Sequence, residues 1–225
     1  MEKIRLIEVK ENILADNKAL ADELRKTLTR EKTFLVNIMA SPGAGKTSLI
    51  LKTIEALRED LRISVIEADI DSMVDSEKVA AQGIYAVQLR TGGFCHLDAS
   101  MVSEGLDAID LSAYDLILME NIGNLVCPAE VDTGAMKNVM ILSVPEGHDK
   151  PLKYPLMFTV CDVLIVNKID YLDISDFDLD AMRNSVLSLN PDIHIFEVSS
   201  KTGQGIPSWA NWLKNQVKTF KEALN

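Results

Sequence analysis

Seven short apolar runs, most of them separated by stretches with a helical pattern, constrain the fold of this chain more than any other feature. The runs are rich in valine and isoleucine and almost continuously apolar, which is typical of strands buried on both faces. They are FLVNIMA (34–40), ISVIEA (63–68), YAVQL (85–89), LILME (116–120), VMILSV (139–144), VLIVNK (163–168) and IHIFEV (193–198). This alternation predicts an α/β fold with a mostly parallel seven-stranded sheet flanked by helices.

Helices are expected between most of these strands and at both ends of the chain. The internal and C-terminal ones are expected at about 46–58, 73–82, 98–107, 151–161, 176–188 and 207–221. An N-terminal helix is expected over residues 8–32, where apolar residues recur at spacings of seven, four and four: Ile13, Leu20, Leu24 and Leu28. We expect this helix to pack on the domain, and an arm that binds a partner is the alternative.

The balance of charges and the cysteine content exclude several classes of protein. The chain has 34 acidic and 23 basic residues, a net charge of −11, and such a surface repels nucleic acids. The stretch MEKIRLIEVKEN has no apolar signal core, and no run has the roughly 18–20 apolar residues of a membrane span. We therefore expect a cytoplasmic protein without membrane association, in which three reduced cysteines indicate metal binding, catalysis or burial.

The first run leads into ASPGAGKTS (40–48), a phosphate-binding loop between a strand and a helix. Glycines let backbone N–H groups curl around a β-phosphate at the positive end of the helix. Lys46 is expected to reach the β- and γ-phosphate oxygens, and the Thr47 hydroxyl to ligate Mg²⁺. The residues expected at the phosphates are Gly43, Ala44, Gly45, Lys46, Thr47 and Ser48. Ala40 replaces the usual first glycine, and its effect is left open.

Two acidic residues at strand ends are candidates for the magnesium site. Asp69 ends the second run and Glu120 the fourth, and a carboxylate that ends an apolar strand is hard to explain as simple solvated charge. Mg²⁺ prefers oxygen ligands, so Asp69 and Glu120 are expected to serve the metal with Thr47 and the γ-phosphate or attacking water. Together with Lys46 they form the predicted catalytic set. The alternative is a carboxylate that caps the next helix.

The sixth run ends in Asn167-Lys168-Ile169-Asp170, which resembles the NKxD guanine motif of GTPases. A carboxylate only accepts hydrogen bonds, so Asp170 can take both donors on the guanine edge, and adenine has no such donor pair. Lys168 can lay its aliphatic stem along the base. After the last run, Ser199, Ser200 and Lys201 resemble the loop that contacts the guanine carbonyl. We therefore expect GTP or GDP as the nucleotide, and residues 33–225 to form a P-loop GTPase domain after an N-terminal helical extension over 1–32.

Cys95 and His96 are adjacent in TGGFCHLDAS (91–100), after the third strand, and Cys127 lies in the segment after the fourth. These three can converge on one metal only if both segments are loops, because neighbours along a strand point to opposite faces. Two thiolates and an imidazole suit tetrahedral Zn²⁺ or square-planar Ni²⁺. The alternative is a buried Cys127 and a capping or surface His96. Cys161, in an apolar context, is expected in the core.

Several long motifs together closely resemble the HypB family, the GTPases that assist nickel insertion into [NiFe]-hydrogenase. They are TGGFCHLDASMV, MENIGNLVCPAEVD, ILSVPEGHDKPLKYPLMF and NKIDYL, and the resemblance runs from about residue 34 to 215. It implies a metal site at Cys95, His96 and Cys127, at or near a dimer interface, and a homodimer that GTP favours and hydrolysis relaxes. It also suggests that Lys150 and Lys153 contact the nucleotide, although both could equally be solvated lysines.

The resemblance implies a GTP-hydrolysing metallochaperone that works with a HypA-type metallochaperone and the hydrogenase large subunit. Many relatives begin with a CxxCGC motif or carry a histidine-rich tract; the chain starts MEKIRLIEVK, so no N-terminal nickel store is expected. The N-terminal helix is a hypothetical dock for the partner.

Two alternatives remain. One is a signalling or scaffold GTPase with a structural zinc site. The other is a urease-type nickel GTPase, although those relatives use a Cys-Pro-His triplet. The sequence is compatible with either nickel or zinc as the metal at this site.

Overall fold

The computed structural model describes residues 9–224 of the chain. The strands in that range are β1 (Phe34–Ala40), β2 (Ile63–Asp69), β3 (Ala86–Arg90), β4 (Leu116–Glu120), β5 (Lys137–Ser143), β6 (Val163–Asn167) and β7 (His194–Glu197). They form one seven-stranded sheet in the order β3-β2-β4-β1-β5-β6-β7, in which every pair of neighbours runs parallel. The predicted fold class is confirmed.

The helices lie at the expected places, except that one expected helix is divided in two and the one-turn helix α5 was not expected. They are α1 (Val9–Glu31), α2 (Lys46–Leu57), α3 (Val74–Ala80), α4 (Ala99–Asp107), α5 (Cys127–Glu130), α6 (Lys150–Lys153), α7 (Pro155–Val160), α8 (Leu179–Leu189) and α9 (Ile206–Glu222). The single helix expected over 151–161 is wrong, because Pro155 disfavours helical backbone at the residue before it. Tyr154 accordingly has a φ of −131° and separates α6 from α7.

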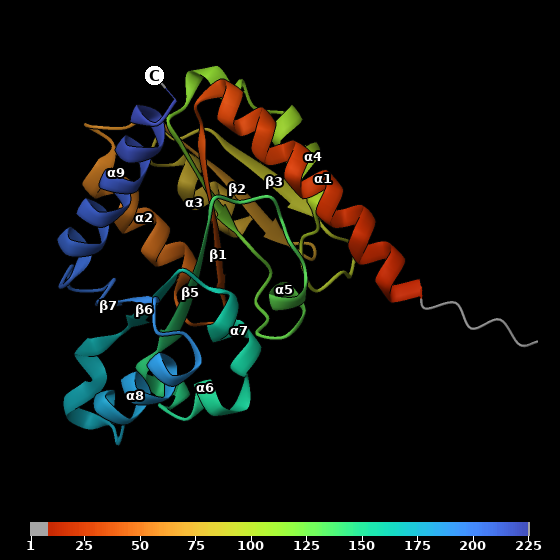
Figure 1. Ribbon diagram of the computed structural model, residues 1–225. Coiled ribbons are helices and arrows are strands. Elements are labelled where there is room, and N and C mark those ends of the chain that lie inside the picture. The colour runs from red at the N-terminus through yellow and green to blue at the C-terminus, as the bar shows by residue number, and fades with distance from the viewer. Residues whose placement is uncertain (1–8, 225) are drawn as a thin grey trace, which may run out of the picture.

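The two faces of the sheet are covered by different helices, since successive strand residues point to opposite faces. On one face, β-strand side chains such as Val36 and Leu118 form a core with α2 and α9, including Trp209. On the other face, α1 and α4 cover β1, β2 and β4, and α7 and α8 cover β5 and β6. Figure 1 shows α2 and α9 lying together, across the sheet from α1 and α4.

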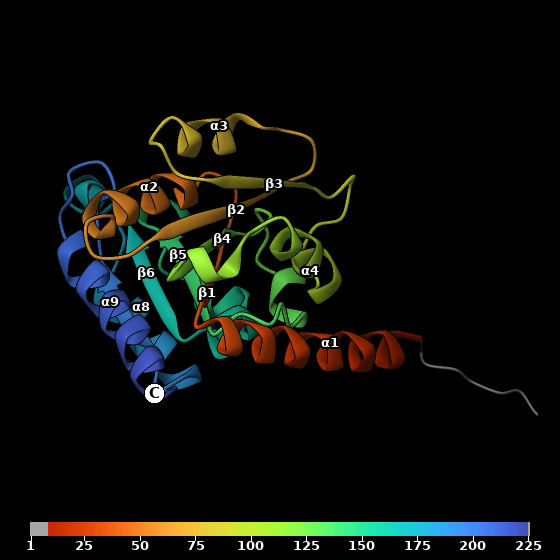
Figure 2. The same cartoon turned by 90° about the horizontal axis from the view of Figure 1, so that it is seen from above.

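Helix α1 packs along the domain. Its side chains Ala21, Leu24 and Leu28 are buried in the same core cluster as strand residues of β1, β2 and β4. Figure 2 shows the helix lying lengthwise beside the sheet, with α4 next to it. The packing agrees with the expected role of this segment, whereas the boundary at residue 32 stays a prediction.

Because the strands are parallel, their carboxyl ends meet at one edge of the sheet, where ligands bind in folds of this kind. The segments that follow β1, β2, β3 and β4 therefore emerge near one another, although they are far apart in the sequence. None of the helices within residues 9–224 is long and apolar enough to cross a membrane.

Candidate nucleotide and metal sites

The phosphate-binding loop joins β1 to α2 with the geometry that the motif predicts. Gly43 and Gly45 have φ values of 78° and 102°, in the left-handed region that side chains disfavour. A Cβ atom on Gly45 would lie 2.5 Å from Nδ2 of Asn167, so the position has no room for a side chain. No side chain caps the start of α2. Its first backbone N–H groups are therefore available to an anion.

A cavity of about 190 Å³ lies beside this loop and collects acidic residues from two neighbouring strands. Its lining includes Lys46, Glu67, Asp69, Glu120 and Asn121. Glu67 and Glu120 are direct partners in the register of β2 and β4. The loop and the ends of these two strands thus bring both predicted carboxylates to the predicted phosphate site, and they add Glu67.

The two buried glutamates are incompletely bonded. Glu120 Oε1 accepts a hydrogen bond of 3.2 Å from the Thr47 hydroxyl and lies 3.6 Å from Nζ of Lys46. Glu67 Oε1 and Glu120 Oε2 have no hydrogen-bond partner in the described part of the chain. Burial raises the pKa of Glu67 to about 10, and the charge of Glu120 adds to the effect. Burial also raises the pKa of Glu120, against the opposing charge of Lys46.

Unbonded oxygens of buried carboxyl groups are costly unless a cation or a donor reaches them. Oxygen ligands close to a phosphate loop are also what Mg²⁺ prefers, so the residues present fit this ion. We did not predict Glu67 from the sequence. A signal was available, because Glu67 lies two residues before Asp69 and therefore on the same face of β2.

Asp69 differs from the two glutamates because backbone N–H groups donate hydrogen bonds to it. Its Oδ1 accepts bonds of 3.0 and 2.7 Å from the backbone N–H groups of Asp71 and Ser72. Partial burial works against the charged form, but these bonds outweigh it and lower the pKa of Asp69. The carboxylate thus holds the turn that follows β2 and also lines the cavity, but it does not cap α3, whose start at Met73 has no side-chain cap. Its role at magnesium stays a prediction.

A second cavity, of about 450 Å³, lies on the other side of the loop and is lined by the predicted base-binding residues. Asn167 donates to the Ala44 carbonyl at 2.9 Å and accepts from the Ser200 backbone and hydroxyl at 3.1 Å each. Lys168 has a left-handed φ of 61° and donates to the Gly43 carbonyl at 2.7 Å. Asn167 and Lys168 therefore bind the phosphate loop itself and fix it against β6.

Asp170 lines the same cavity beside the loop after β7. One carboxylate oxygen accepts a 2.6 Å bond from the Ser199 hydroxyl, and Lys201 Nζ lies 4.0 Å from the other. Ser48 also lines this cavity. The structure thus brings the NKxD residues, the Ser199–Lys201 loop and the phosphate loop together. An acceptor-only group on the wall of a cavity of this size can select a base with two adjacent donors.

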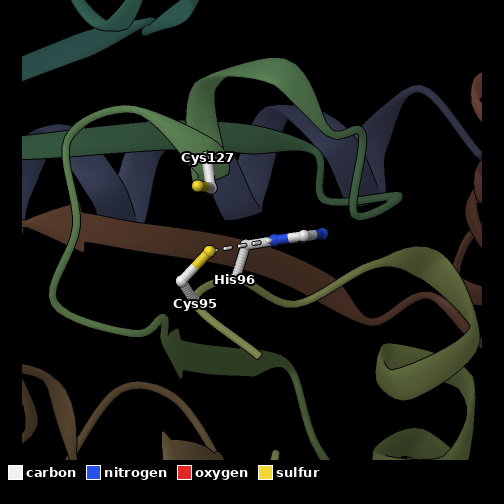
Figure 3. A group of neighbouring side chains, drawn as sticks. All are labelled: Cys95, His96 and Cys127. Carbon is white, nitrogen blue, oxygen red and sulfur yellow. Dashed lines mark hydrogen bonds between the residues drawn. The ribbon is translucent and has the colours of Figure 1, made fainter. Parts of the chain in front are cut away.

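Cys95, His96 and Cys127 converge, with one ligand atom from each lying within 4.8 Å of the others. Cys95 and His96 lie in the bend between β3 and α4, with Cys95 Sγ 3.8 Å from His96 Nδ1. Figure 3 shows the two cysteine sulfurs facing each other from separate segments. The neighbouring Cys127 thiol is the largest cause that raises the pKa of the Cys95 thiol.

The expectation that both metal-binding segments are loops is wrong for Cys127. This residue is the first of the one-turn helix α5. The ligands converge nevertheless, because Cys127 is the first residue of α5 and therefore lies where the preceding loop ends. Two thiols and an imidazole at this distance suit Ni²⁺ or Zn²⁺.

Two asparagine side chains connect the metal-binding segments to each other. Asn121, directly after β4, accepts at Oδ1 from the backbone N–H groups of Leu97 and Ile122 at 3.2 and 2.8 Å. Its Nδ2 donates to Asn37 of β1 at 3.0 Å. Asn124 donates to the Cys95 carbonyl at 3.3 Å. We did not predict these residues, since nothing in their local sequence indicates a partner so far away.

The remaining predicted residues lie outside both cavities. Lys153 pairs with Asp149 on the exposed surface of α6, and Lys150 Nζ lies 5.3 Å from the centre of the Tyr154 ring. Within a single chain neither lysine reaches the nucleotide pockets. Cys161 is 3% exposed and belongs to the core under α7 and α8, as expected.

Comparisons with known proteins agree with this arrangement of motifs. Residues 34–197 match the model of the CobW/HypB/UreG nucleotide-binding domain. The hydrogenase maturation factor HypB of Azotobacter vinelandii is 42% identical over 219 residues, 97% of this chain and 72% of that protein. The crystal structure of HypB from Helicobacter pylori in complex with nickel has a TM-score of 0.87 at 34% identity, covering 91% of this chain and 96% of that one.

A second crystal structure, hydrogenase maturation factor HypB from Archaeoglobus fulgidus, has a TM-score of 0.85 at 38% identity. The match covers 91% of this chain and 100% of that chain. Sequence and structure therefore agree on the same relatives along nearly the whole chain. The resemblance first seen in the motifs is confirmed, and the chain belongs to the HypB family, within the CobW/HypB/UreG group of nucleotide-binding domains.

Proposed function

We propose that this protein is a GTP-hydrolysing metallochaperone that binds nickel or zinc and assists nickel insertion into [NiFe]-hydrogenase. The convergence of Cys95, His96 and Cys127 within 4.8 Å carries this proposal. Family membership and the nickel complex of the Helicobacter pylori relative support it. A cytoplasmic location, a HypA-type partner and the hydrogenase large subunit complete the proposal.

The nucleotide in this proposal is GTP or GDP. Gly43 to Ser48 hold the phosphates, with Lys46 at the β- and γ-phosphate oxygens. Asn167 and Lys168 brace the loop, Asp170 accepts from the guanine edge, and residues 199–201 close the base pocket. The proximity of Ser199 to Asp170, at 2.6 Å, supports a base pocket whose acceptor is held in place before the ligand arrives.

Magnesium is held in the proposal by Thr47, Glu120 and Asp69, with Glu67 next to them. When bound, the ion neutralises charge that develops on the phosphates. The unpartnered oxygens of Glu67 and Glu120 support a cation at this place. Lys46 adds a fixed positive charge 3.6 Å from Glu120, on the phosphate side of the same cavity.

Hydrolysis is proposed to change metal affinity through the short segment that begins at Glu120 and ends at Cys127. One end of this segment faces the phosphate cavity and the other carries a metal ligand. A GTP-bound homodimer would be the closed state, with Lys153, and also Lys150, reaching the partner's nucleotide. Lys153 is exposed and Lys150 partly exposed on α6, and neither lines either cavity of its own chain, which is compatible with that role.

The test is Ni²⁺ binding by equilibrium dialysis, nucleotide-free, with GDP and with a non-hydrolysable GTP analogue. We expect nickel affinity to change about 5–150-fold between nucleotide states, the usual range of coupling between sites. Cys127→Ala should remove both the binding and its dependence on nucleotide. Cys161→Ala is the matched control, because it removes a buried thiol outside the site.

Two outcomes would argue for other functions. Tight metal binding that is the same in all three states, with Cys127→Ala losing stability, would indicate a structural zinc site in a signalling or scaffold GTPase. Nickel binding unaffected by Cys127→Ala would reject the proposed site itself.

A further inference from the structure

Asn17 of α1 joins the two segments that carry the predicted metal ligands. Its Oδ1 accepts a 2.8 Å bond from the backbone N–H of Ala99, and its Nδ2 donates a 2.7 Å bond to the carbonyl of Asp132. Ala99 lies three residues after His96, and Asp132 lies five residues after Cys127. The Asn17 side chain therefore connects the segment that follows His96 to the segment that follows Cys127.

The rest of α1 holds the Cys127 side of this bridge in place. Arg25 forms an ion pair with Asp132 and donates from Nε to the carbonyl of Ala135 at 3.4 Å. Gly134 lies directly under the helix, where a Cβ would come within 3.0 Å of Leu24 and 3.1 Å of the Ala21 carbonyl. The segment after α5 and the helix are therefore in close backbone contact, which only a residue without a side chain allows.

A metal site loses affinity when its ligands must be ordered at the moment of binding, because that ordering costs conformational entropy. Groups that orient ligands without touching the metal lower this cost. Asn121 and Asn124 already join the two segments from within the domain. Asn17 joins them from outside, through bonds to residues 82 and 115 positions away in sequence.

We propose that Asn17 is a positioning residue of the metal site and that α1 is the clasp that holds the Cys95–His96 segment against the Cys127 segment. The inference rests on the proposed metal site and goes beyond it by assigning the N-terminal helix a part in metal affinity. It follows that any interaction that draws α1 away from the domain weakens metal binding without touching a ligand.

The experiment is titration of Ni²⁺ into the nucleotide-free full chain, followed by thiolate-to-nickel charge-transfer absorption. Asn17→Ala should weaken nickel binding by roughly tenfold, within the range seen when groups behind metal ligands are removed, and should change the absorption spectrum. Arg25→Ala should weaken it less, because Arg25 holds only the Cys127 segment. Both residues are partly exposed, so both variants should fold.

Asn190→Ala is the matched control for a purely structural effect. Asn190 Nδ2 likewise donates to backbone carbonyls, those of Phe158, Thr159 and Cys161, but away from the cluster. It should lower stability and leave the nickel Kd and spectrum unchanged. An unchanged Kd and spectrum in Asn17→Ala, or an equal loss of affinity in Asn190→Ala, would overturn the inference while the metal site stands. If Cys127→Ala also binds nickel like the parent protein, the metal site itself fails and the inference fails with it.

Discussion

A carboxylate lies at each end of strand β4, and the two differ in how completely they are bonded to other protein groups. Asp115, directly before the strand, accepts bonds from the Arg62 backbone and guanidinium at 2.8–3.0 Å and pairs with Lys221. Glu120, its last residue, has one oxygen near Thr47 and Lys46 and the other without a partner. The amino end of the strand is thus fully bonded, and the carboxyl end is not.

The ionisation of the two groups follows from this difference. Partial burial works against the charge of Asp115, yet the bonds from Arg62 and Lys221 hold its pKa below the ordinary value. Burial raises the pKa of Glu120, since Lys46, Glu67 and Thr47 compensate it only in part. A carboxylate whose partners are all protein groups stabilises the fold. A carboxylate that lacks partners in a cavity keeps its bonding capacity for a ligand.

The largest effect is expected at the incompletely bonded end. Glu120→Gln keeps the size of the side chain but removes its charge, and should slow single-turnover GTP hydrolysis by roughly 10²–10⁴-fold. The free energy of unfolding without ligand should stay equal or rise, because a buried, poorly compensated charge is lost. Urea denaturation beside the kinetic assay measures both. If Glu120→Gln hydrolysed GTP at the parental rate, Glu120 would be a structural group like Asp115, and the two ends of β4 would not differ in function.

Asp170 is an intermediate case, with one oxygen bonded to Ser199 and the other 4.0 Å from Lys201. Asp170→Asn replaces one of the two acceptor oxygens with an NH2 donor that faces the guanine N–H groups, and should weaken GTP binding by about 2–5 kcal/mol. Competition with GTP, XTP and ATP measures it, and XTP should be the least affected because xanthine presents an acceptor there. Unchanged GTP binding would contradict the assignment of the base pocket.

The smallest effect is expected at the fully bonded end and should fall on stability alone. Asp115→Asn should lower the free energy of unfolding by about 1–3 kcal/mol at pH 7, since charge-assisted bonds to Arg62 and Lys221 are lost. GTP hydrolysis measured well below the unfolding transition should not change. A clear loss of activity at unchanged stability would show that the two ends of β4 are not divided in this way.

The same variant has a predictable pH dependence. The folded pKa of Asp115 lies below its unfolded value, so its stabilisation is complete above the unfolded pKa of about 3.9 and is lost as the pH falls through the folded pKa. The difference in unfolding free energy between the parent protein and Asp115→Asn should therefore be constant from pH 5 to 7 and shrink below about pH 4. A difference that persists unchanged at pH 3 would mean that lost packing, and not lost charge, causes the effect.

Much of this molecule could be predicted from short stretches of sequence. The apolar runs located all seven strands of the described sheet, and the loop at 40–48 and the motif at 167–170 lie at the carboxyl ends of their strands, as expected. These features are local, because a buried strand, a glycine turn and a helix start are each specified by adjacent residues. The break at Pro155 is local too, because a proline by itself disfavours helical backbone at the residue before it.

Other features depended on the tertiary structure alone. The pairing of Glu67 with Glu120 requires the register between β2 and β4, which are separated in sequence by α3, β3 and α4. The bonds of Asn17 to Ala99 and Asp132 depend on where α1 lies on the sheet. The sequence by itself determined the fold class and the positions of the motifs, because each strand and each motif is specified by adjacent residues. Only the packing of parallel strands and distant helices decided which residues come into contact. A backbone group far along the chain leaves no pattern in the sequence around the side chain that binds it.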